Sequence, residues 1–268
     1  MSPAIILDPD LKASKADVEA ITQTVLDYAE SWHTGEYQRM ERALYPNLAK
    51  RILRPHPKTG NPVIEWMDAA ELIESARGSA GDGGNPPEIT IAIYDVFQDI
   101  ATVKGFLGCI DYLHLAKVGG RWQIINVLWN QNEKAQDPFN VVISSEEVKA
   151  VEQAVMDYMR CWYGAGHEPL PPVLHPALVK RAFHIHEHTS NRYLHQLTAS
   201  ELMQDAIAVA QRDNHPPEDQ WQIDIKVFDI FNNIATARAV GARWIDYLHL
   251  AKVGDQWQII NILYDLFG

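Results

Sequence analysis

The sequence predicts an α+β protein built from two copies of one domain, because a long strand-like stretch occurs in it twice. DYLHLAKVGGRWQIINVLW at 111–129 returns as DYLHLAKVGDQWQIINILY at 246–264. From Asp111 to Leu128 the two copies differ at only three of eighteen positions. Chance does not produce such agreement, so we interpret it as a duplication.

Shorter matches extend the repeat over most of the chain. They are VLDYAESW and VMDYMRCW at 25–32 and 155–162, LAKR and LVKR at 48–51 and 178–181, and DVFQDIAT and DIFNNIAT at 95–102 and 229–236. A unit of about 120 residues is long enough to bury its own core, unlike a short solenoid repeat. We therefore predict two domains, 1–130 and 144–268, with a linker at 131–143.

Each copy is expected to begin with helices. Two pairs have the spacing of an N-cap residue and its acidic partner: Ser14 with Asp17, and Ser144 with Glu147. A second helical stretch, EYQRMERAL, follows Gly35, whereas its counterpart HEPLPPVL is interrupted by proline. A third helix is predicted to start near Asp68 and near Thr198, again with capping-box spacing.

β-Branched and alternating residues predict strands in the rest of each copy. An extended segment is expected at 51–58 and at 181–188. Three strands should complete each copy, at 89–98, 100–118 and 121–129, and at 221–231, 234–253 and 256–264. The sequences VGG and VGD are expected to form the last hairpin turns.

The composition excludes several classes of protein. A net charge of −12 argues against a nucleic-acid groove or an anionic membrane surface, since both select for lysine and arginine. No apolar run approaches the roughly 20 residues that cross a bilayer, and the first residues do not have the pattern of a signal peptide. The two cysteines, Cys109 and Cys161, occupy non-equivalent positions, so a disulfide framework is not expected. We predict a cytoplasmic protein without a cofactor.

The order of these elements, with the motif D-Y-L-x-L-x-K-V-x-G-x-W-x-I-x-N, resembles the nuclear-transport-factor-like cone fold. Within that fold the chain is similar to the lumazine-binding family, which is related to SnoaL-like polyketide cyclases. The resemblance implies two tandem cones, each with three N-terminal helices packed on a strongly curved antiparallel sheet. It also implies a small-molecule ligand, but the fold hosts isomerases, dehydratases, cyclases, hydrolases and non-catalytic binders, so it implies no particular reaction.

Relatives of this fold commonly dimerise through their sheets, which implies that the two copies form an internal pseudo-dimer. Because side chains alternate along a strand, Asp111 and Leu113 should face the pocket, and their neighbours the opposite way. Four residues are expected near the contact between the two sheets: Tyr112, His114, Tyr247 and His249. A homodimer of the whole chain is compatible with this arrangement.

A tyrosine and an aspartate are candidates for the site in each copy. Asp111 and Asp246 begin an otherwise apolar strand, where a carboxylate is costly unless it is paired or protonated. In ketosteroid isomerase, an enzyme of this fold, the equivalent strand begins with an aspartic acid that donates a hydrogen bond to an oxyanion. The resemblance gives Tyr28 and Tyr158, on the first helices, as the partners. The alternative is that these tyrosines are ordinary core residues and that each aspartate caps a turn.

The histidines are concentrated in the second copy. His184, His186 and His188 alternate along one extended segment, so their rings should share a face. The resemblance makes His184 or His186 the general base, titrating near neutral pH. A zinc site with His175, His188 or His195 as a third ligand, and an exposed histidine-rich edge, are the alternatives. No fixed spacing of carboxylates or cysteines supports a metal, so we expect none.

These features favour an acid/base enzyme that isomerises, dehydrates or cyclises a small cyclic or carbonyl compound in the second copy. His184 or His186 would move the proton, while Tyr158 and Asp246 would stabilise the oxyanion. One alternative is a non-catalytic binder of an aromatic or heterocyclic ligand that uses Trp32, Trp162 and Trp244 as stacking surfaces. A metal-dependent hydrolase is another.

Overall fold

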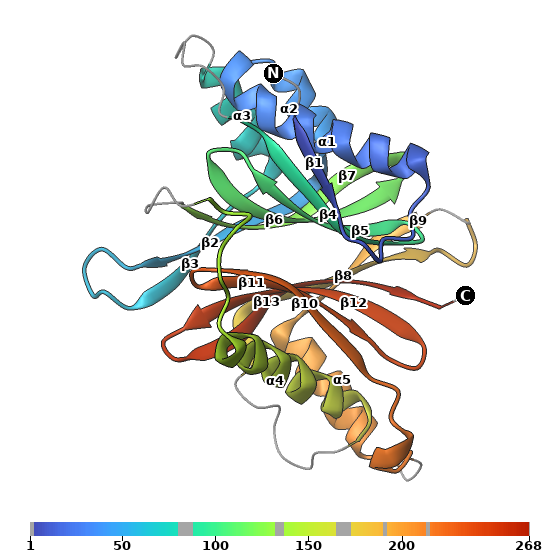
Figure 1. Ribbon diagram of the computed structural model, residues 1–268. Helices are drawn as coiled ribbons and strands as arrows, with labels where there is room; N and C mark the ends of the chain where they lie inside the picture. Colours follow the sequence, from blue (N-terminus) through green and yellow to red (C-terminus); the bar gives the residue numbers. More distant parts are fainter. Residues whose placement is uncertain are drawn as a thin grey trace. The chain divides into compact units, whose positions relative to one another are not determined.

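The chain divides into two compact units, Met1–Val141 and Val142–Gly268 (Figure 1). The structure is a computed structural model, and it describes residues 3–79, 88–131, 137–164, 173–189, 192–212 and 215–267. Part of the predicted linker (132–136), most of the glycine-rich stretch at 78–87 and most of the HEPLPPVL segment lie outside these residues. Each unit has the helices-on-sheet architecture of a cone-fold domain.

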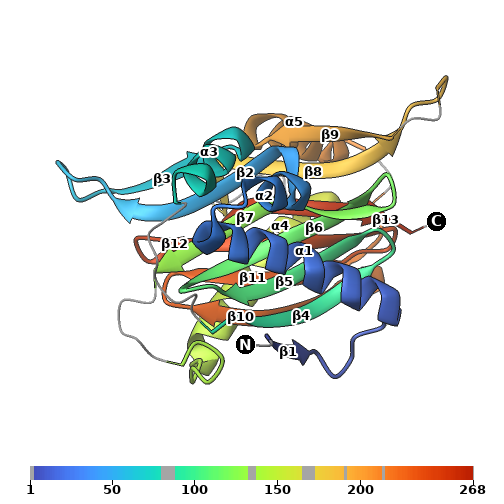
Figure 2. The same ribbon diagram turned by 90° about the horizontal axis from the view of Figure 1, so that it is seen from above.

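The first unit packs three helices on one face of a curved, mixed sheet (Figures 1 and 2). Its strand order is β1-β4-β5-β6-β7-β2-β3, and the β1–β4 and β2–β7 pairs are parallel. Its elements are β1 (Ala4–Leu7), α1 (Lys15–Thr34), α2 (Tyr37–Ala43), β2 (Leu44–Pro55), β3 (Pro62–Met67), α3 (Ala69–Gly78), β4 (Thr90–Phe97), β5 (Ile100–Phe106), β6 (Cys109–Val118) and β7 (Arg121–Gln131).

The second unit repeats this plan, with strand order β10-β11-β12-β13-β8-β9 and a parallel β13–β8 pair. Its elements are α4 (Ser145–Trp162), β8 (Leu174–Ile185), β9 (Arg192–Thr198), α5 (Ala199–Ala210), the 3-10 helix η1 (Glu218–Gln220), β10 (Asp224–Phe231), β11 (Ile234–Val240), β12 (Trp244–Val253) and β13 (Gln256–Leu266). The curvature follows from register shifts in the β6–β7 and β12–β13 pairs, since a bulge bends the strand that carries it.

The helix starts confirm the predicted caps. Ser14 and Ser144 accept hydrogen bonds from the backbone nitrogens of Asp17 and Glu147. Asp68 and Thr198 form complete capping boxes at the starts of α3 and α5. The side-chain oxygens thus satisfy backbone N–H groups that have no partner inside the helix.

The predicted strands need correction. The stretches 100–118 and 234–253 each form two strands, because a short turn divides them. Gly108 makes the first turn with a φ of 92°, a backbone conformation that favours glycine. The apolar pattern continues through these tight turns, so periodicity did not reveal them. Strands β1, β3 and β9 were also not predicted, and β2 and β8 begin well before the extended segments expected at 51–58 and 181–188.

The helices cover the predicted face of the long strands. In the first unit, Ile21, Val25 and Tyr28 of α1 are fully buried in one cluster with Leu113 and Leu115 of β6. Alternation puts Tyr112 and His114 on the opposite face, and the same holds for Tyr247 and His249 in the second unit. The internal pseudo-dimer through these outer faces stays a prediction.

Each first helix is anchored at its start by an acidic side chain. Asp17 of α1 accepts from Lys117 Nζ at 2.9 Å and Trp122 Nε1 at 3.0 Å. Glu147 of α4 accepts in the same way from Lys252 and Trp257. The hydrogen bond from Lys117, with those from Ser14 and Trp122, lowers the pKa of Asp17 to about 2. The start of the first helix of each unit is therefore fixed to the strand pair β6–β7 or β12–β13, close to the turn that joins the two strands.

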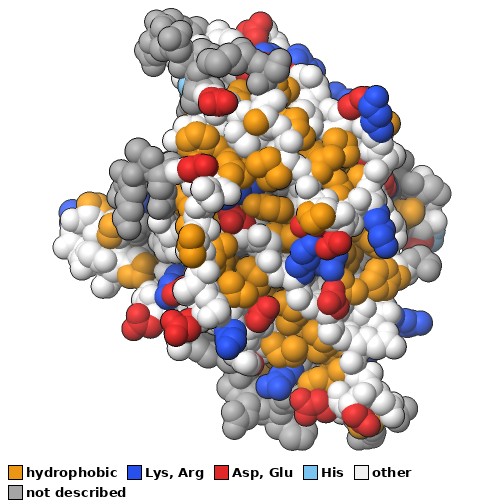
Figure 3. All heavy atoms as spheres, viewed as in Figure 1, with side chains coloured by type: hydrophobic (Ala, Val, Ile, Leu, Met, Phe, Trp, Pro, Cys, Tyr) orange, Lys and Arg blue, Asp and Glu red, His pale blue; other side chains and the backbone are white. Residues whose placement is uncertain are grey.

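On the face shown in Figure 3, acidic and basic side chains are intermixed with hydrophobic ones. Within the described part of the chain, no helix is long and apolar enough to cross a membrane.

The capping box of α5 yields a prediction about stability. Replacing Thr198 with alanine removes the oxygen that accepts from Glu201 N, and should lower the free energy of unfolding by about 1 kcal/mol. Urea unfolding followed by circular dichroism measures the change. Thr198→Ser keeps the oxygen and is the control. Equal losses in the two variants would show that the cap does not stabilise the helix.

Candidate functional site

A buried lysine, tyrosine and aspartate meet inside the second unit. Lys180 Nζ on β8 donates to Tyr158 Oη on α4 at 2.7 Å, and Tyr158 Oη donates to Asp246 Oδ2 on β12 at 3.1 Å. Lys180 Nζ also lies 3.0 Å from Asp246 Oδ1. Trp244 Nε1 donates to Asp246 Oδ2 at 2.9 Å. Oδ2 of Asp246 thus accepts two hydrogen bonds, while Oδ1 faces the ammonium group in an ion pair without a hydrogen bond of normal geometry among the described residues.

Electrostatics favour this pairing over either charge alone. Asp246 is fully buried and the side chain of Lys180 is 8% exposed, so each ion would be costly without the other. Burial raises the pKa of Tyr158 well above its ordinary value, and the charge of Asp246 raises it further. The Tyr158 hydroxyl therefore keeps its proton and links the lysine to the aspartate.

Aromatic rings surround the ammonium group. Lys180 Nζ lies 4.4 Å from the ring centre of Tyr264, 5.2 Å from that of Trp162 and 5.5 Å from that of Tyr158. Ring faces attract a cation at such distances, which stabilises a charge that is largely removed from water. The lysine is accordingly held in one place by three rings and a carboxylate.

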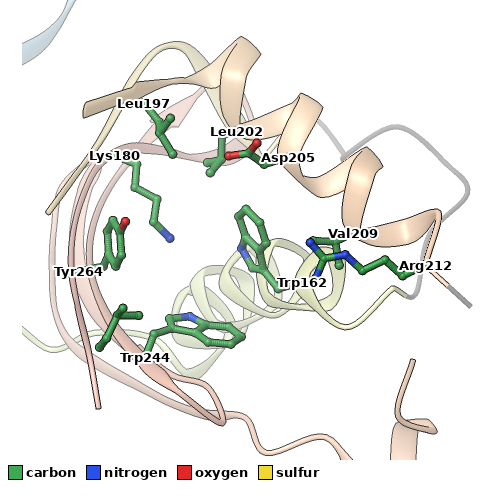
Figure 4. Close-up of a pocket in the computed structure, with 10 residues that line it drawn as sticks. Trp162, Lys180, Leu197, Leu202, Asp205, Val209, Arg212, Trp244 and Tyr264 are labelled. Atoms are coloured by element: carbon green, nitrogen blue, oxygen red, sulfur yellow. The ribbon is translucent and has the colours of Figure 1, made fainter. Parts of the chain in front are cut away.

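Lys180 extends into a cavity of about 350 Å³ between the curved sheet and the helices α4 and α5 (Figure 4). That volume is at the lower end of the range of small-molecule sites, about 300–1,000 Å³. The wall is mainly aromatic and aliphatic, with charged groups from α5. The lining residues are Trp162, Lys180, Leu197, Leu202, Asp205, Val209, Arg212, Trp244, Tyr264 and Leu266.

Local packing fixes the wall residue Trp244. A Cβ atom on Gly241 would lie 2.6 Å from the Trp244 ring, so this turn requires glycine. The Tyr163 ring lies 5.9 Å from the Trp244 ring, and Tyr163 Oη accepts from Ala242 N at 3.0 Å. Tyr163 also donates to Gln222 O. Tyr163 thus ties both the turn before β12 and the segment before β10 to the end of α4.

The first unit contains the same three polar residues with different surroundings. Lys50 Nζ donates to Tyr28 Oη, which donates to Asp111 Oδ2 at 3.3 Å. Lys50 lies 3.5 Å from Asp111 Oδ1, and burial raises the pKa of Asp111 despite the lysine charge. Its ammonium lies 5.0 Å from the Trp129 ring centre and 5.7 Å from that of Trp32.

Three positions around this group differ between the units. Trp129 replaces Tyr264, Cys109 replaces Trp244, and Arg54 replaces His184. Burial raises the pKa of the Cys109 thiol to about 12, so the thiol stays protonated. Arg54 lies 5.2 Å above the Trp129 ring. In the second unit the equivalent pair is Tyr264, which has a hydroxyl group, and His184, which can titrate.

The three histidines differ in burial and in their contacts. His184 Nε2 lies 3.0 Å from Tyr264 Oη, and the His184 ring stacks on His195 at 4.7 Å. Burial lowers the pKa of His184, and the nearby His195 charge lowers it further. His186 and His188 are exposed in the turn after β8. Although the strand ends at Ile185, the rings stay near one another: His184 and His186 both contact the Tyr193 ring, at 6.0 and 6.3 Å between ring centres, and His186 lies 5.7 Å from His188. A role for His184 or His186 as a base stays a prediction.

The candidate residues are brought together in part. Tyr158 and Asp246 form the expected pair, yet neither lines the cavity, and the tyrosine proton points to the aspartate. In this geometry Lys180 and Tyr264 stand where ligand donors were expected. Both were missed, although the lysine was visible in LAKR and LVKR, where a charged residue recurs in an extended apolar segment. Trp162 and Trp244 line the cavity as the binder alternative requires.

Metal ligation was the third alternative for the histidines. Among the residues the structure describes, no group of three or more histidine, cysteine, aspartate or glutamate side chains could hold a metal ion. His184 and His195 stack face to face, and His175 accepts from the backbone nitrogen of Ala177. The absence of a metal stays a prediction.

The buried ion pair yields a prediction about stability. Lys180→Met should lower the free energy of unfolding by about 3–5 kcal/mol, because it leaves Asp246 charged and uncompensated. Adding Asp246→Asn should recover more than half of this loss, because the buried charge is then gone. Urea unfolding of the two single variants and the double variant measures the coupling. A loss below about 1 kcal/mol for Lys180→Met would contradict the buried-pair interpretation.

Comparison with known proteins places the chain. The model of a family described as "Putative lumazine-binding" matches residues 16–130 and 146–265. Similar solved structures include an NTF2-like protein of unknown function from Silicibacter pomeroyi DSS-3, with 18% identity over 44% of this chain and 98% of that chain and a TM-score of 0.37. Another is an NTF2-like protein of unknown function from Shewanella baltica OS155, with 17% identity over 48% of this chain and 99% of that chain and a TM-score of 0.38. A ketosteroid isomerase-like protein from Erwinia carotovora atroseptica SCRI1043 is also similar, with 14% identity over 47% of this chain and 99% of that chain and a TM-score of 0.34. No curated protein matches. Because the family model covers both halves of the sequence, the chain belongs to this lumazine-binding family as two consecutive copies of its domain.

Proposed function

We propose that the second unit binds a planar aromatic or heterocyclic small molecule that carries ring carbonyl groups. The observation that carries this proposal is the ammonium of Lys180, held between Tyr264 and Trp162 in a cavity of about 350 Å³. A flat ring can pack against these aromatic side chains, and a ring carbonyl can accept a hydrogen bond from the lysine. Lumazine, a fused bicyclic heterocycle with ring carbonyls, is a ligand of this class.

The charged residues at the helix side of the cavity support a ligand with a polar substituent. Asp205 and Arg212 both come from α5 or its end and line the cavity together with the apolar Val209 (Figure 4). A hydroxyl or carboxyl group on the ligand could pair with one of them. The apolar ring would then occupy the interior, while the polar substituent would point to α5.

A second candidate, acid/base catalysis on a small cyclic or carbonyl compound, is favoured by one contact. Tyr264 lines the cavity and its Oη lies 3.0 Å from His184 Nε2. Burial raises the pKa of Tyr264 to about 12, so it carries a proton at neutral pH. Since the pKa of His184 is lowered, its ring is neutral there and can accept a proton through Tyr264.

Binding is tested by filling the cavity. Leu197→Trp should reduce the affinity for lumazine at least tenfold, because the larger ring occupies the ligand's space. Isothermal titration calorimetry measures the affinity, and thermal melting checks that the variant folds. Met67→Trp, the same change at the equivalent position of the first unit, should leave the affinity unchanged. Unaltered binding by Leu197→Trp would place the ligand elsewhere.

Catalysis is tested by proton exchange. If the second unit accelerates deuterium exchange at the carbon next to the carbonyl of a small cyclic ketone, His184→Gln should slow it by about 10²–10⁴-fold. His186→Ala should change the rate little, because His186 is exposed in the turn. Arg54→Gln is the matched change in the first unit. Proton NMR in D₂O follows the exchange, and equal rates in all four proteins would leave only the binder.

A further inference from the structure

The inner part of the cavity presents hydrogen-bond donors. Lys180 Nζ donates to Tyr158 and pairs with Asp246, which leaves one of its three N–H groups for a ligand. Trp162 Nε1 is buried. It interacts with the Tyr158 hydroxyl group, whose pKa it lowers, but it makes no hydrogen bond of normal geometry with the described residues. In Figure 4 the indole nitrogen of Trp162 and the Lys180 ammonium face the same space. Two donors therefore converge on one point.

The acceptors next to these donors are engaged with protein groups or, like Asp246 Oδ1, are buried and do not line the cavity. Asp246 Oδ2 accepts from Tyr158 and Trp244, and Oδ1 pairs with Lys180. Tyr158 Oη accepts from Lys180 and donates to Asp246. A ligand N–H or O–H group placed here would find no suitable partner among these groups. A ligand atom without a proton would find two donors.

We infer that this part of the cavity selects the deprotonated form of a weakly acidic heterocycle or phenol, with its anionic atom against Lys180 Nζ and Trp162 Nε1. The inference rests on the proposed binding function and names the ionisation state of the ligand. A buried N–H without a hydrogen bond of normal geometry is uncommon and costs free energy, and an anionic ligand atom in line with the N–H would recover part of that cost.

The carboxylate of Asp246 does not cancel this preference. Asp246 is fully buried and does not line the cavity, so an anion bound to the ammonium is closer to Lys180 than to Asp246. Interaction energy falls with distance, so the nearer charge dominates. Other charged or titratable groups lie around the described part of the cavity. They are Asp205 from α5, Arg212 just after α5, Tyr158 from α4, Tyr264 from β13 and, near Tyr264, His184, His195, Tyr193 and Asp265.

The sign of the pH dependence follows. If the site prefers the anion, the acidic group of the bound ligand has a lower pKa than that of the free ligand. The affinity then rises with pH between the two pKa values and is constant above that of the free ligand. A preference of tenfold corresponds to a difference of about one pKa unit.

The test is a spectroscopic pH titration of lumazine, whose neutral and anionic forms absorb differently, with and without the intact protein. We expect the pKa of bound lumazine to be lower than that of free lumazine by about one unit or more. Trp162→Phe removes one donor and keeps the ring, so it should reduce this difference. Trp66→Phe, at an exposed position of the first unit, should not. An N-methylated lumazine that cannot ionise should bind with constant affinity across the same pH range.

The outcomes separate this inference from the binding function. Lumazine that binds with an unshifted or raised pKa would overturn the preference for the anion and leave the binding site in place. If none of the heterocycles tested binds the intact protein, both the preference for the anion and the proposed binding function are overturned. A pKa difference that is unchanged in Trp162→Phe would show that the indole N–H does not bind the anionic atom. Lys180→Met then tests whether the ammonium group alone lowers the pKa of the bound ligand.

Discussion

The buried contact between Lys180 and Asp246, bridged by Tyr158, is the interaction on which the second unit depends. It joins α4, β8 and β12, three elements far apart in the sequence, at one point beneath the helices. Each charge in isolation would be expensive at this depth, so the three residues must be present together. The first unit keeps the same group in Lys50, Tyr28 and Asp111. Such a group constrains where the first helix lies on the sheet, whether or not a ligand is bound.

Close to this shared group, the units differ in the side chains that surround it. The second unit has Tyr264 and Trp244 where the first has Trp129 and Cys109. Tyr264 has a hydroxyl group where Trp129 has an indole N–H, and Trp244 has an indole N–H where Cys109 has a thiol. The kinds of hydrogen-bonding group around the lysine therefore differ between the units. The duplication thus conserves the polar framework and varies the cavity wall. This explains why the strand motif is repeated almost unchanged while the histidine-rich segment is not.

Much of the fold could be predicted from the sequence, and less of the site. The repeat, the capping boxes and the inward face of β6 follow from local pattern and periodicity, which are properties of neighbouring residues. The split of 100–118 into β5 and β6 could not be predicted in this way, because the apolar pattern continues through the turn at Gly108. The Tyr158–Asp246 pair came from the resemblance, but Lys180 could not be assigned to it, since its partners lie on other elements. Likewise, the end of β8 at Ile185, which leaves His184 half-buried and His186 exposed, is a boundary that periodicity does not fix.

The anchoring of α4 at both ends limits how this domain can change in length. Glu147 fixes its start through Lys252 and Trp257, and Tyr158 fixes its last turn through Lys180. One inserted residue between these two points would rotate everything after it by about 100° around the helix axis and carry Trp162 away from the cavity. Asp17 and Tyr28 keep the same separation in the first unit, although the repeat offset drifts in the later loops. Insertions are therefore expected only in the connections, while the interval from the acidic anchor to the tyrosine has a fixed length in both copies.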